Sequence, residues 1–463
     1  MQVSRNRWSG SLHFVERAAF YLFLLLSLVL LGSAQDLHLS ISASILLVFC
    51  LYVNVFRAGG GSVDRSYAVV SFAFAGLALI FVITSIADRY DLLVRHDLAS
   101  PDPAALSKLG EKALLPAPGA RPLLVFLLPG AVFLSSLILH RDEKISEKFI
   151  YNGTLVLAAL VFICLVQYAV TPNHLLLSEK IAYRDSFTSV FVNRNTSATF
   201  CGLIFIVALA LLRPLSLASR VAVSRRGRWT VRDGRAADWR LAVALCISGM
   251  GLLLSNSRGG IVSTGFAAAV VLALEAGSPR RWLSRGNRYR WLLVIGVAAV
   301  LAPVLLDSIL FRFEVQGLES ARWCAYGAVL DRSVDRLAWG WGFGSFQWVF
   351  PSFRAASCGV YGEWEYLHSA HLEMIFSGGL VAYVIALSAF GYIVWRLIRG
   401  VRLRVNSKAF PIAGLGVSLL VFQHSLVDFS VQIPGFAVIF AAFLGATMAF
   451  CRARKGLPGS GDS

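Results

Sequence analysis

The chain has 463 residues, of which 57% are hydrophobic and 15% are charged. This composition excludes an ordinary soluble enzyme and predicts an all-α, polytopic integral membrane protein. The net charge of +17 does not indicate nucleic acid binding. The basic residues lie in short connectors between apolar runs, where the positive-inside bias and anionic lipid head groups account for them.

The first apolar run covers residues 18–31 and follows Arg5, Arg7 and Arg17. Because Gly-Ser-Ala-Gln comes next, the start of the chain resembles a secretory signal with a small-residue cleavage site. A second apolar run begins almost at once, which favours an uncleaved first transmembrane helix.

The apolar runs predict about twelve transmembrane helices. They are expected at residues 18–34, 39–56, 67–87, 122–140, 149–170, 195–212, 239–255, 259–275, 291–311, 371–395, 410–427 and 432–450. The chain then divides into three parts. Residues 1–311 hold helices 1–9, residues 312–370 form one large periplasmic loop, and residues 371–463 hold helices 10–12 and a basic cytoplasmic tail.

The charges of the connectors predict the orientation. Connector 213–238 has seven arginines against two aspartates, and connector 276–290 has five arginines and no acid, so both are expected in the cytoplasm. Segment 312–370 has five arginines and six acids, and connector 88–121 has five residues of each charge. These two are expected on the other side. The other cytoplasmic segments are expected at 57–66, 140–148, 396–409 and both termini.

This orientation brings four polar features to the non-cytoplasmic face: Arg194, Arg258, the 312–370 loop and Asp428. An arginine near the hydrocarbon boundary either snorkels to the interface or serves a wet site. Its planar fork binds phosphate oxygens bidentately. Several arginines on one face therefore favour an anion site for the phosphate or diphosphate of a membrane lipid.

The 312–370 loop is the longest polar and aromatic segment of the chain. Its twelve aromatic residues between Trp323 and Tyr366 suit either sugar rings or an interfacial belt. Cys324 and Cys358 also lie here, where an oxidising compartment permits a disulfide. His368 can act as a general base, because an imidazole accepts a proton near neutral pH. For His371, at the start of a helix, a structural hydrogen bond is favoured.

Motifs at 193–195 (Asn-Arg-Asn), 257–260 (Ser-Arg-Gly-Gly), 322–323 (Arg-Trp) and 340–346 (Gly-Trp-Gly-Phe-Gly-Ser-Phe) precede His368. In this order they resemble the O-antigen ligase and polymerase superfamily of bacterial membrane glycosyltransferases. His368-Ser369 is followed after nine residues by Gly379, as in the ligase signature. Ala382 stands at the last signature position, while His371 and Ser377 stand where a tyrosine and an acidic residue are usual. The resemblance covers roughly residues 190–450.

The resemblance implies a polyprenyl (undecaprenyl) diphosphate-linked glycan as donor and an inner-membrane enzyme whose active site faces the periplasm. Arg194, Arg258 and Arg322 would bind the diphosphate, with Arg322 and His368 as the catalytic pair. Fixed cations that hold the departing diphosphate lower the barrier, without a metal ion or a cofactor. A base opposite the leaving group predicts inversion at the sugar carbon.

The supporting residues are His371, Asn193, Asn195 and Asp428. Asp428 either orients a histidine or arginine or caps a turn.

Other interpretations remain open. The His-Ser spacing favours a ligase that acts on lipid A-core over a polymerase that lengthens glycans. A carrier or flippase also suits twelve helices, and Gly60-x-x-x-Asp64-Arg65 begins like a carrier loop motif. That motif does not continue, and a carrier needs no external loop of this length. A non-catalytic envelope assembly protein is a further alternative.

Overall fold

The computed structural model describes residues 2–31, 36–57, 65–89, 120–176, 178–212, 221–223, 229–231, 238–276, 321–354, 364–404 and 407–452. Within these ranges the α-helices are α1 (Gln2–Leu31), α2 (Asp36–Arg57), α3 (Arg65–Arg89), α5 (Ala120–Leu139), α6 (Glu143–Val170), α7 (Arg194–Leu211), α8 (Trp239–Leu254), α9 (Arg258–Ala276), α12 (Ala321–Val334), α13 (Phe346–Val349), α14 (Ala370–Leu403), α15 (Ala409–His424) and α16 (Pro434–Thr447).

The expected class, a helical polytopic membrane protein, is confirmed. Six described helices are long and apolar enough to cross a membrane, and five shorter apolar helices accompany them. Every expected span overlaps a described helix except 291–311, which lies outside the described residues, as does most of connector 88–121. Exposed apolar side chains such as Phe72 and Val170 cover the outer faces of the helices, as lipid contact requires.

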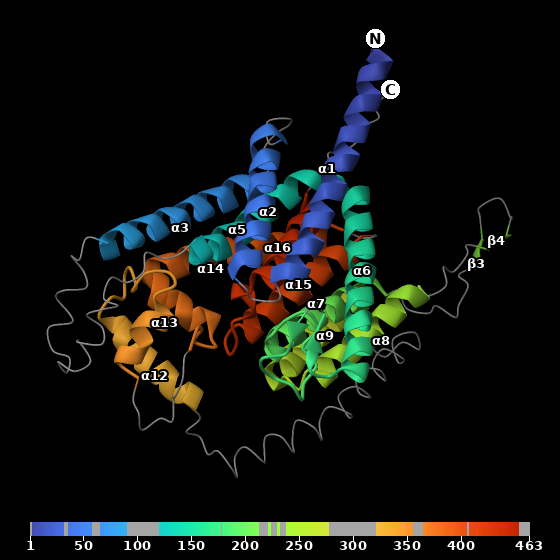
Figure 1. Ribbon diagram of the computed structural model, residues 1–463. Coiled ribbons are helices and arrows are strands. Elements are labelled where there is room, and N and C mark those ends of the chain that lie inside the picture. Colours follow the sequence, from blue (N-terminus) through green and yellow to red (C-terminus); the bar gives the residue numbers. More distant parts are fainter. Residues whose placement is uncertain are drawn as a thin grey trace.

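Two helices form the centre of the bundle. Buried residues make up 83% of α7 and 94% of Pro434–Cys451, the segment that begins with α16. α7 packs against α8, α9 and α15, whereas α16 packs against α5 and α1 (Figure 1). α14 lies between α3 and α15. This arrangement surrounds the first turns of α7 and α9 with other helices.

Short strands occur beside the helices. β1 (His174–Leu175) pairs antiparallel with β2 (Ser178–Glu179) in the connection between α6 and α7. β3 (Val221–Val223) pairs with β4 (Trp229–Val231) in the basic connector 213–238, away from the helical bundle in Figure 1. The prediction of an all-α chain is therefore correct for the bundle and incomplete for these two connectors.

The expected loop 312–370 contains structure of its own, in α12 and α13. These helices lie at the same end of the bundle as the connection between α6 and α7 (Figure 1). A small hydrophobic core of eight buried residues joins them to the start of α14. Its members are Ala325, Tyr326, Val329, Trp341, Phe346, Phe350, Leu367 and Phe376. Several aromatics expected for sugar or interface contacts therefore pack internally instead.

α14 is interrupted at Gly379, which has φ 72° and ψ 179°. The expected span over 371–395 lies within α14, which is long and apolar enough to cross a membrane but contains this break in its backbone. The break frees backbone groups of α14, and these groups bond to the loop that precedes the helix. Trp341 N donates to Phe376 O and Gly342 N donates to Ser377 O, both at 2.8 Å. Leu380 N in turn donates to Leu337 O at 2.7 Å and Val381 N to Ala338 O at 3.3 Å. The loop 337–342 thus completes the broken helix, as irregular backbone in a membrane protein requires.

Candidate functional site

His368 lies directly before α14 and is held there by its backbone. The Tyr326 hydroxyl of α12 donates to the His368 carbonyl at 2.8 Å. Ala370 N donates to the carbonyls of Ser425 at 3.0 Å and Asp428 at 3.1 Å. The Ser369 side chain accepts from Leu372 N and caps the helix. α12, α14 and the loop after α15 therefore fix the position of His368 together.

The His368 side chain is half-buried between aromatic rings. Its ring centroid lies 4.9 Å from that of Phe429 and 5.7 Å from that of Trp364, both in edge-on contact. The pKa of His368 is lowered to about 4, chiefly by burial and also by the Arg322 guanidinium, while the Asp428 carboxylate acts in the opposite direction. Nδ1 is buried and has no hydrogen-bond partner among the described residues. The imidazole is therefore neutral at pH 7, and no described residue satisfies its buried Nδ1.

Arg322 lies in the first turn of α12, one turn before Tyr326. Burial raises the pKa of Tyr326 to about 12, with Arg322 lowering it and Asp428 raising it. The tyrosine hydroxyl thus stays protonated and remains a donor to His368. No ion pair joins Arg322 to any residue in the described ranges. Arg322, His368 and Asp428 form one electrostatic group, because Arg322 and Asp428 both act on His368.

Asp428 is completely buried and begins a hydrogen-bond network. Its Oδ2 accepts from Ser430 N at 2.8 Å and from the Ser430 hydroxyl. Thr199 Oγ1 of α7 lies 2.8 Å from Ser430 Oγ and 2.6 Å from His424 Nδ1 of α15. Oδ1 of Asp428 has no partner in the part of the chain that the structure describes. Asp428 therefore both caps the turn 428–430 and keeps one oxygen for another group.

Arg194 opens α7 beside the loop that precedes it. Its guanidinium lies 5.3 Å from the centre of the Tyr183 ring and 3.5 Å from Ser186 Oγ. The Asn193 side chain caps α7 by accepting from Asn195 N at 2.7 Å. Asn195 Oδ1 then accepts from Ser257 Oγ at 2.8 Å. This bond brings the start of α7 next to the start of α9, where Arg258 lies half-exposed.

His424 connects the two groups of residues, and the sequence analysis did not identify it. A Cβ added to Gly259 would lie 3.1 Å from the His424 ring, and one added to Gly260 would lie 2.5 Å from Ala198 Cβ. The glycines after Arg258 thus admit the imidazole and the neighbouring helix α7. Asp428 and Arg322 also act electrostatically on His424. In the sequence His424 stands between Gln423 and Ser425 at the end of an apolar run, which is a weak signal.

His371 and Glu373 stabilise the start of α14. His371 Nδ1 lies 3.2 Å from the Tyr383 hydroxyl, and Nε2 lies 3.2 Å from Phe422 O. Both ring nitrogens therefore have partners, in keeping with a structural role. Glu373, which the sequence analysis did not single out, is buried and accepts from Leu367 N at 2.8 Å.

Strained backbone is concentrated around these residues. Among the described residues other than glycine, positive φ occurs at Tyr183, Ser189, Asn256 and His368, with values of 50° to 63°. Two precede α7, one precedes Arg258 and the last precedes α14. Such conformations cost about 1–3 kcal/mol each and persist where the surrounding structure holds them, commonly at functional sites.

These features define a polytopic membrane protein with a histidine, an arginine and a buried carboxylate gathered at one end of its helices. Residues 241–387 match the family model described as O-antigen ligase. This domain occurs in O-antigen ligases and polymerases. The matched segment contains Arg258, Arg322 and His368, and the expected resemblance is confirmed over it. Arg194 and Asp428 lie outside the match. No curated protein matches the chain.

Proposed function

We propose that this protein is a membrane glycosyltransferase that moves a glycan from a polyprenyl diphosphate to an acceptor sugar hydroxyl. The observation that carries the proposal is the neutral His368 imidazole beside Arg322 and Asp428, within a segment that matches the O-antigen ligase family. A neutral imidazole accepts a proton, and a guanidinium binds phosphate oxygens. One site thus holds a base and an anion-binding group.

In the proposed reaction a ring nitrogen of His368 takes the proton of the acceptor hydroxyl. The acceptor oxygen bonds to the anomeric carbon as the bond from that carbon to the diphosphate oxygen breaks, with inversion. Arg322 binds the negative charge that builds up on the diphosphate, which lowers the barrier. The Asp428 carboxylate favours the imidazolium that forms, because opposite charges attract.

Arg194 and Arg258 extend the diphosphate site in this proposal. The hydrogen bond between Asn195 and Ser257 holds the starts of α7 and α9 together, so the two arginines open neighbouring helices. His424 lies against Gly259 and is bonded to Thr199, in the network that reaches Asp428. Asn193 and Asn195 act by positioning Arg194.

We place the site on the periplasmic side of the bacterial inner membrane, with both termini in the cytoplasm. Connector charge supports this orientation. Cys324 in α12 is disulfide-bonded, and disulfides persist in oxidising compartments. Cys358, the expected partner, lies outside the described residues. Lipid A-core is the proposed acceptor because of the His-Ser spacing at 368–369. A growing glycan would make the protein a polymerase.

Reconstitution tests the proposal. The purified protein is incubated in vesicles with a polyprenyl-diphosphate glycan and either lipid A-core or a second lipid-linked glycan, without added metal. Glycan on lipid A-core supports a ligase, and a longer lipid-linked chain supports a polymerase. The absence of both products would overturn the enzyme assignment and favour a carrier.

Variants then test the site residues. His368→Gln and Arg322→Ala should each lower the transfer rate at least about 100-fold, as loss of a general base or of charge stabilisation does. Arg258→Lys should also lower it, because lysine lacks the planar fork. The matched controls are His174→Gln in β1 and Arg402→Ala at the far end of α14. Near wild-type rates in both site variants would contradict the assignment.

A further inference from the structure

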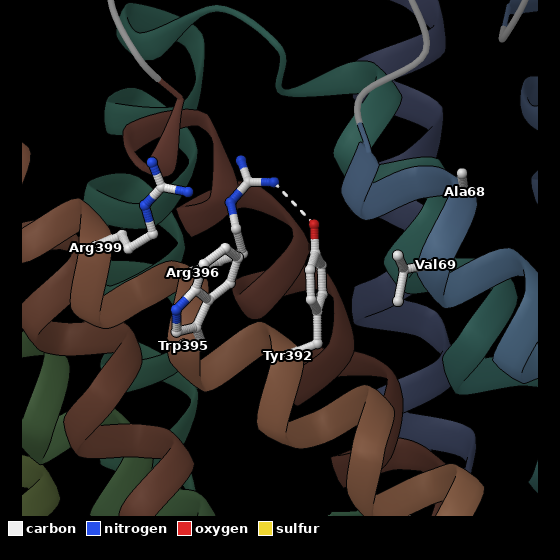
Figure 2. Close-up of a pocket in the computed structure, with 6 residues that line it drawn as sticks. All are labelled: Ala68, Val69, Tyr392, Trp395, Arg396 and Arg399. Atoms are coloured by element: carbon white, nitrogen blue, oxygen red, sulfur yellow. Dashed lines mark hydrogen bonds between the residues drawn. The ribbon is translucent and has the colours of Figure 1, made fainter.

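A second polar site lies at the far end of α14, about 40 Å from His368 by helix length. It is a cavity of about 280 Å³ between α3 and α14. The residues that line it are Ala68, Val69, Tyr392, Trp395, Arg396 and Arg399. Figure 2 shows both guanidinium groups and the Tyr392 hydroxyl at one end of the cavity, with Val69 across from them on α3. The cavity is thus polar at one end and apolar along its wall.

Arg396 is a fixed charge within this site. Its side chain is buried, on the same packed face of α14 as Ile393, Leu397 and Gly400. Nη1 donates to Ser66 Oγ at 2.5 Å and to the Tyr392 hydroxyl at 3.2 Å, and Nη2 donates to Cys451 O at 3.2 Å. These bonds join α3 and α14 to the short 3-10 helix Met448–Cys451, which follows α16. Arg396 therefore holds the polar end of the cavity in place.

Arg399 is the exposed charge of the site. Its guanidinium lies 4.9 Å from the centre of the Trp395 ring, which keeps its donors near the cavity mouth. Trp395 itself is 47% exposed. No ion pair with Arg399 occurs in the described part of the chain. A charged group that rests on an exposed indole at a helix end is suited to a ligand that is anionic at one end and apolar at the other.

The apolar wall continues beyond the cavity. Val69 and Ile398 are each 38% exposed, and Phe72, one turn along α3 from Val69, is 80% exposed. These side chains face the position that acyl chains occupy around a membrane protein. A free phosphate would use the guanidinium groups and leave this surface uncovered.

We propose that this cavity binds one anionic glycerophospholipid, with its phosphodiester at Arg399 and Arg396 and an acyl chain along Val69 and Trp395. Guanidinium groups bind phosphate oxygens with charge-assisted hydrogen bonds. Basic residues at the end of a transmembrane helix attract anionic lipids, and connectors 57–66 and 396–409 on either side of the cavity were both predicted to be cytoplasmic. The lipid then lies in the leaflet opposite the candidate active site. This inference does not depend on the proposed enzyme function.

Native mass spectrometry of the full-length protein in detergent tests the proposal. With added phosphatidylglycerol, the wild-type protein should retain one lipid molecule. The Arg399→Ala variant should bind this lipid with about fivefold lower affinity, the change expected for loss of one basic contact to an anionic lipid. Trp395→Ala should weaken retention as well. The control is Arg402→Ala, which makes the same charge change one turn further along α14, outside the cavity, and should bind as the wild type does.

Three results would overturn the proposal. An equal loss of lipid affinity in Arg399→Ala and Arg402→Ala would mean that the overall basic charge of this end of α14 attracts the lipid, without a specific site. Equal retention of phosphatidylcholine would mean that the headgroup charge is not recognised. Competition by soluble glycerol phosphate would mean that the site binds phosphate without the lipid. Glycan transfer by the same variants is measured separately, so failure of the lipid site and failure of the enzyme assignment are distinguishable.

Discussion

Gly340 and Gly379 meet backbone to backbone at the break in α14. A Cβ on Gly340 would lie 2.5 Å from Gly379 N, and a Cβ on Gly379 would lie 2.3 Å from Ala338 O. Both residues also have positive φ, of 73° and 72°. Only glycine satisfies both the contact and the conformation without strain. Gly340 of the 340–346 motif and Gly379 of the His-Ser signature thus belong to one packing contact.

Gly379→Ala should destabilise the protein by at least about 1–3 kcal/mol through backbone strain alone. The clash with residue 338 adds to this and displaces the helix start that carries His368, so glycan transfer should fall too. The matched control is Gly391→Ala in the second half of α14, where an added Cβ meets nothing within 4 Å. It should be neutral or stabilise the helix by up to about 1 kcal/mol. Thermal unfolding in detergent measures both; equal melting temperatures would contradict the packing argument.

The lowered pKa of His368 predicts the pH dependence of transfer. A group with its pKa at about 4 is unprotonated and able to act as a base at all higher pH values. The acid limb of kcat/KM should therefore lie near pH 4, well below the value of about 6.5 for an ordinary imidazole. Asp428→Asn removes the charge that raises the pKa, so the limb should move lower still. A limb near 6.5 would show that His368 is not the base.

The same shift affects stability. Between pH 6.5 and 4 the unfolded chain binds a proton at His368 that the folded protein does not bind. Stability from this group should therefore fall as the pH is lowered through that window. The difference in melting temperature between wild type and His368→Gln, measured from pH 7 to pH 4, should shrink as the pH falls.

Thr199→Val tests the network that joins α7 to α15. The substitution keeps the shape of the side chain but leaves His424 Nδ1 and Ser430 Oγ without their shared partner. Loss of that partner inside the protein should cost about 1–3 kcal/mol. Thr154→Val in α6 is the control, because among the described residues that buried hydroxyl bonds only to a carbonyl of its own helix, Ile150 O. A similar loss of stability in both variants would argue against a special role for Thr199.

The disulfide at Cys324 predicts a labelling pattern. A maleimide reagent applied to the denatured, unreduced protein should modify the free cysteines, including Cys246. Cys324 should be modified only after reduction. Mass spectrometry of peptides reports both. Labelling of Cys324 without reduction, in protein taken directly from its membrane, would place the segment in a reducing compartment and oppose the periplasmic assignment.

The sequence was sufficient to predict the helical bundle, because a bilayer allows few other solutions for long apolar runs. It did not specify the break at Gly379, since Ser377-Gly378-Gly379 permits a kink without requiring one and the flanking residues suit a helix. The sign of φ at Gly379 depends on a loop about forty residues earlier. The expected span 291–311 lies outside the described residues and stays a prediction.

In the candidate site, too, some residues could be predicted from the sequence and others could not. Arg194, Arg258 and His368 could be selected because each is polar at the edge of an apolar run. His424 could not, because its importance arises from contacts with Gly259 and Thr199 on two other helices. The catalytic roles of Arg322 and His368 remain predictions for the experiments above.

The break in α14 also constrains how the protein enters the membrane. Four backbone groups at residues 376, 377, 380 and 381 pair with the loop 337–342, which is synthesised earlier. In bare hydrocarbon each such group would cost several kcal/mol. The loop 337–342 must therefore be in place before these four groups can be satisfied. A fully hydrogen-bonded α14 thus requires that the segment carrying α12 and the loop 337–342 has already folded against it.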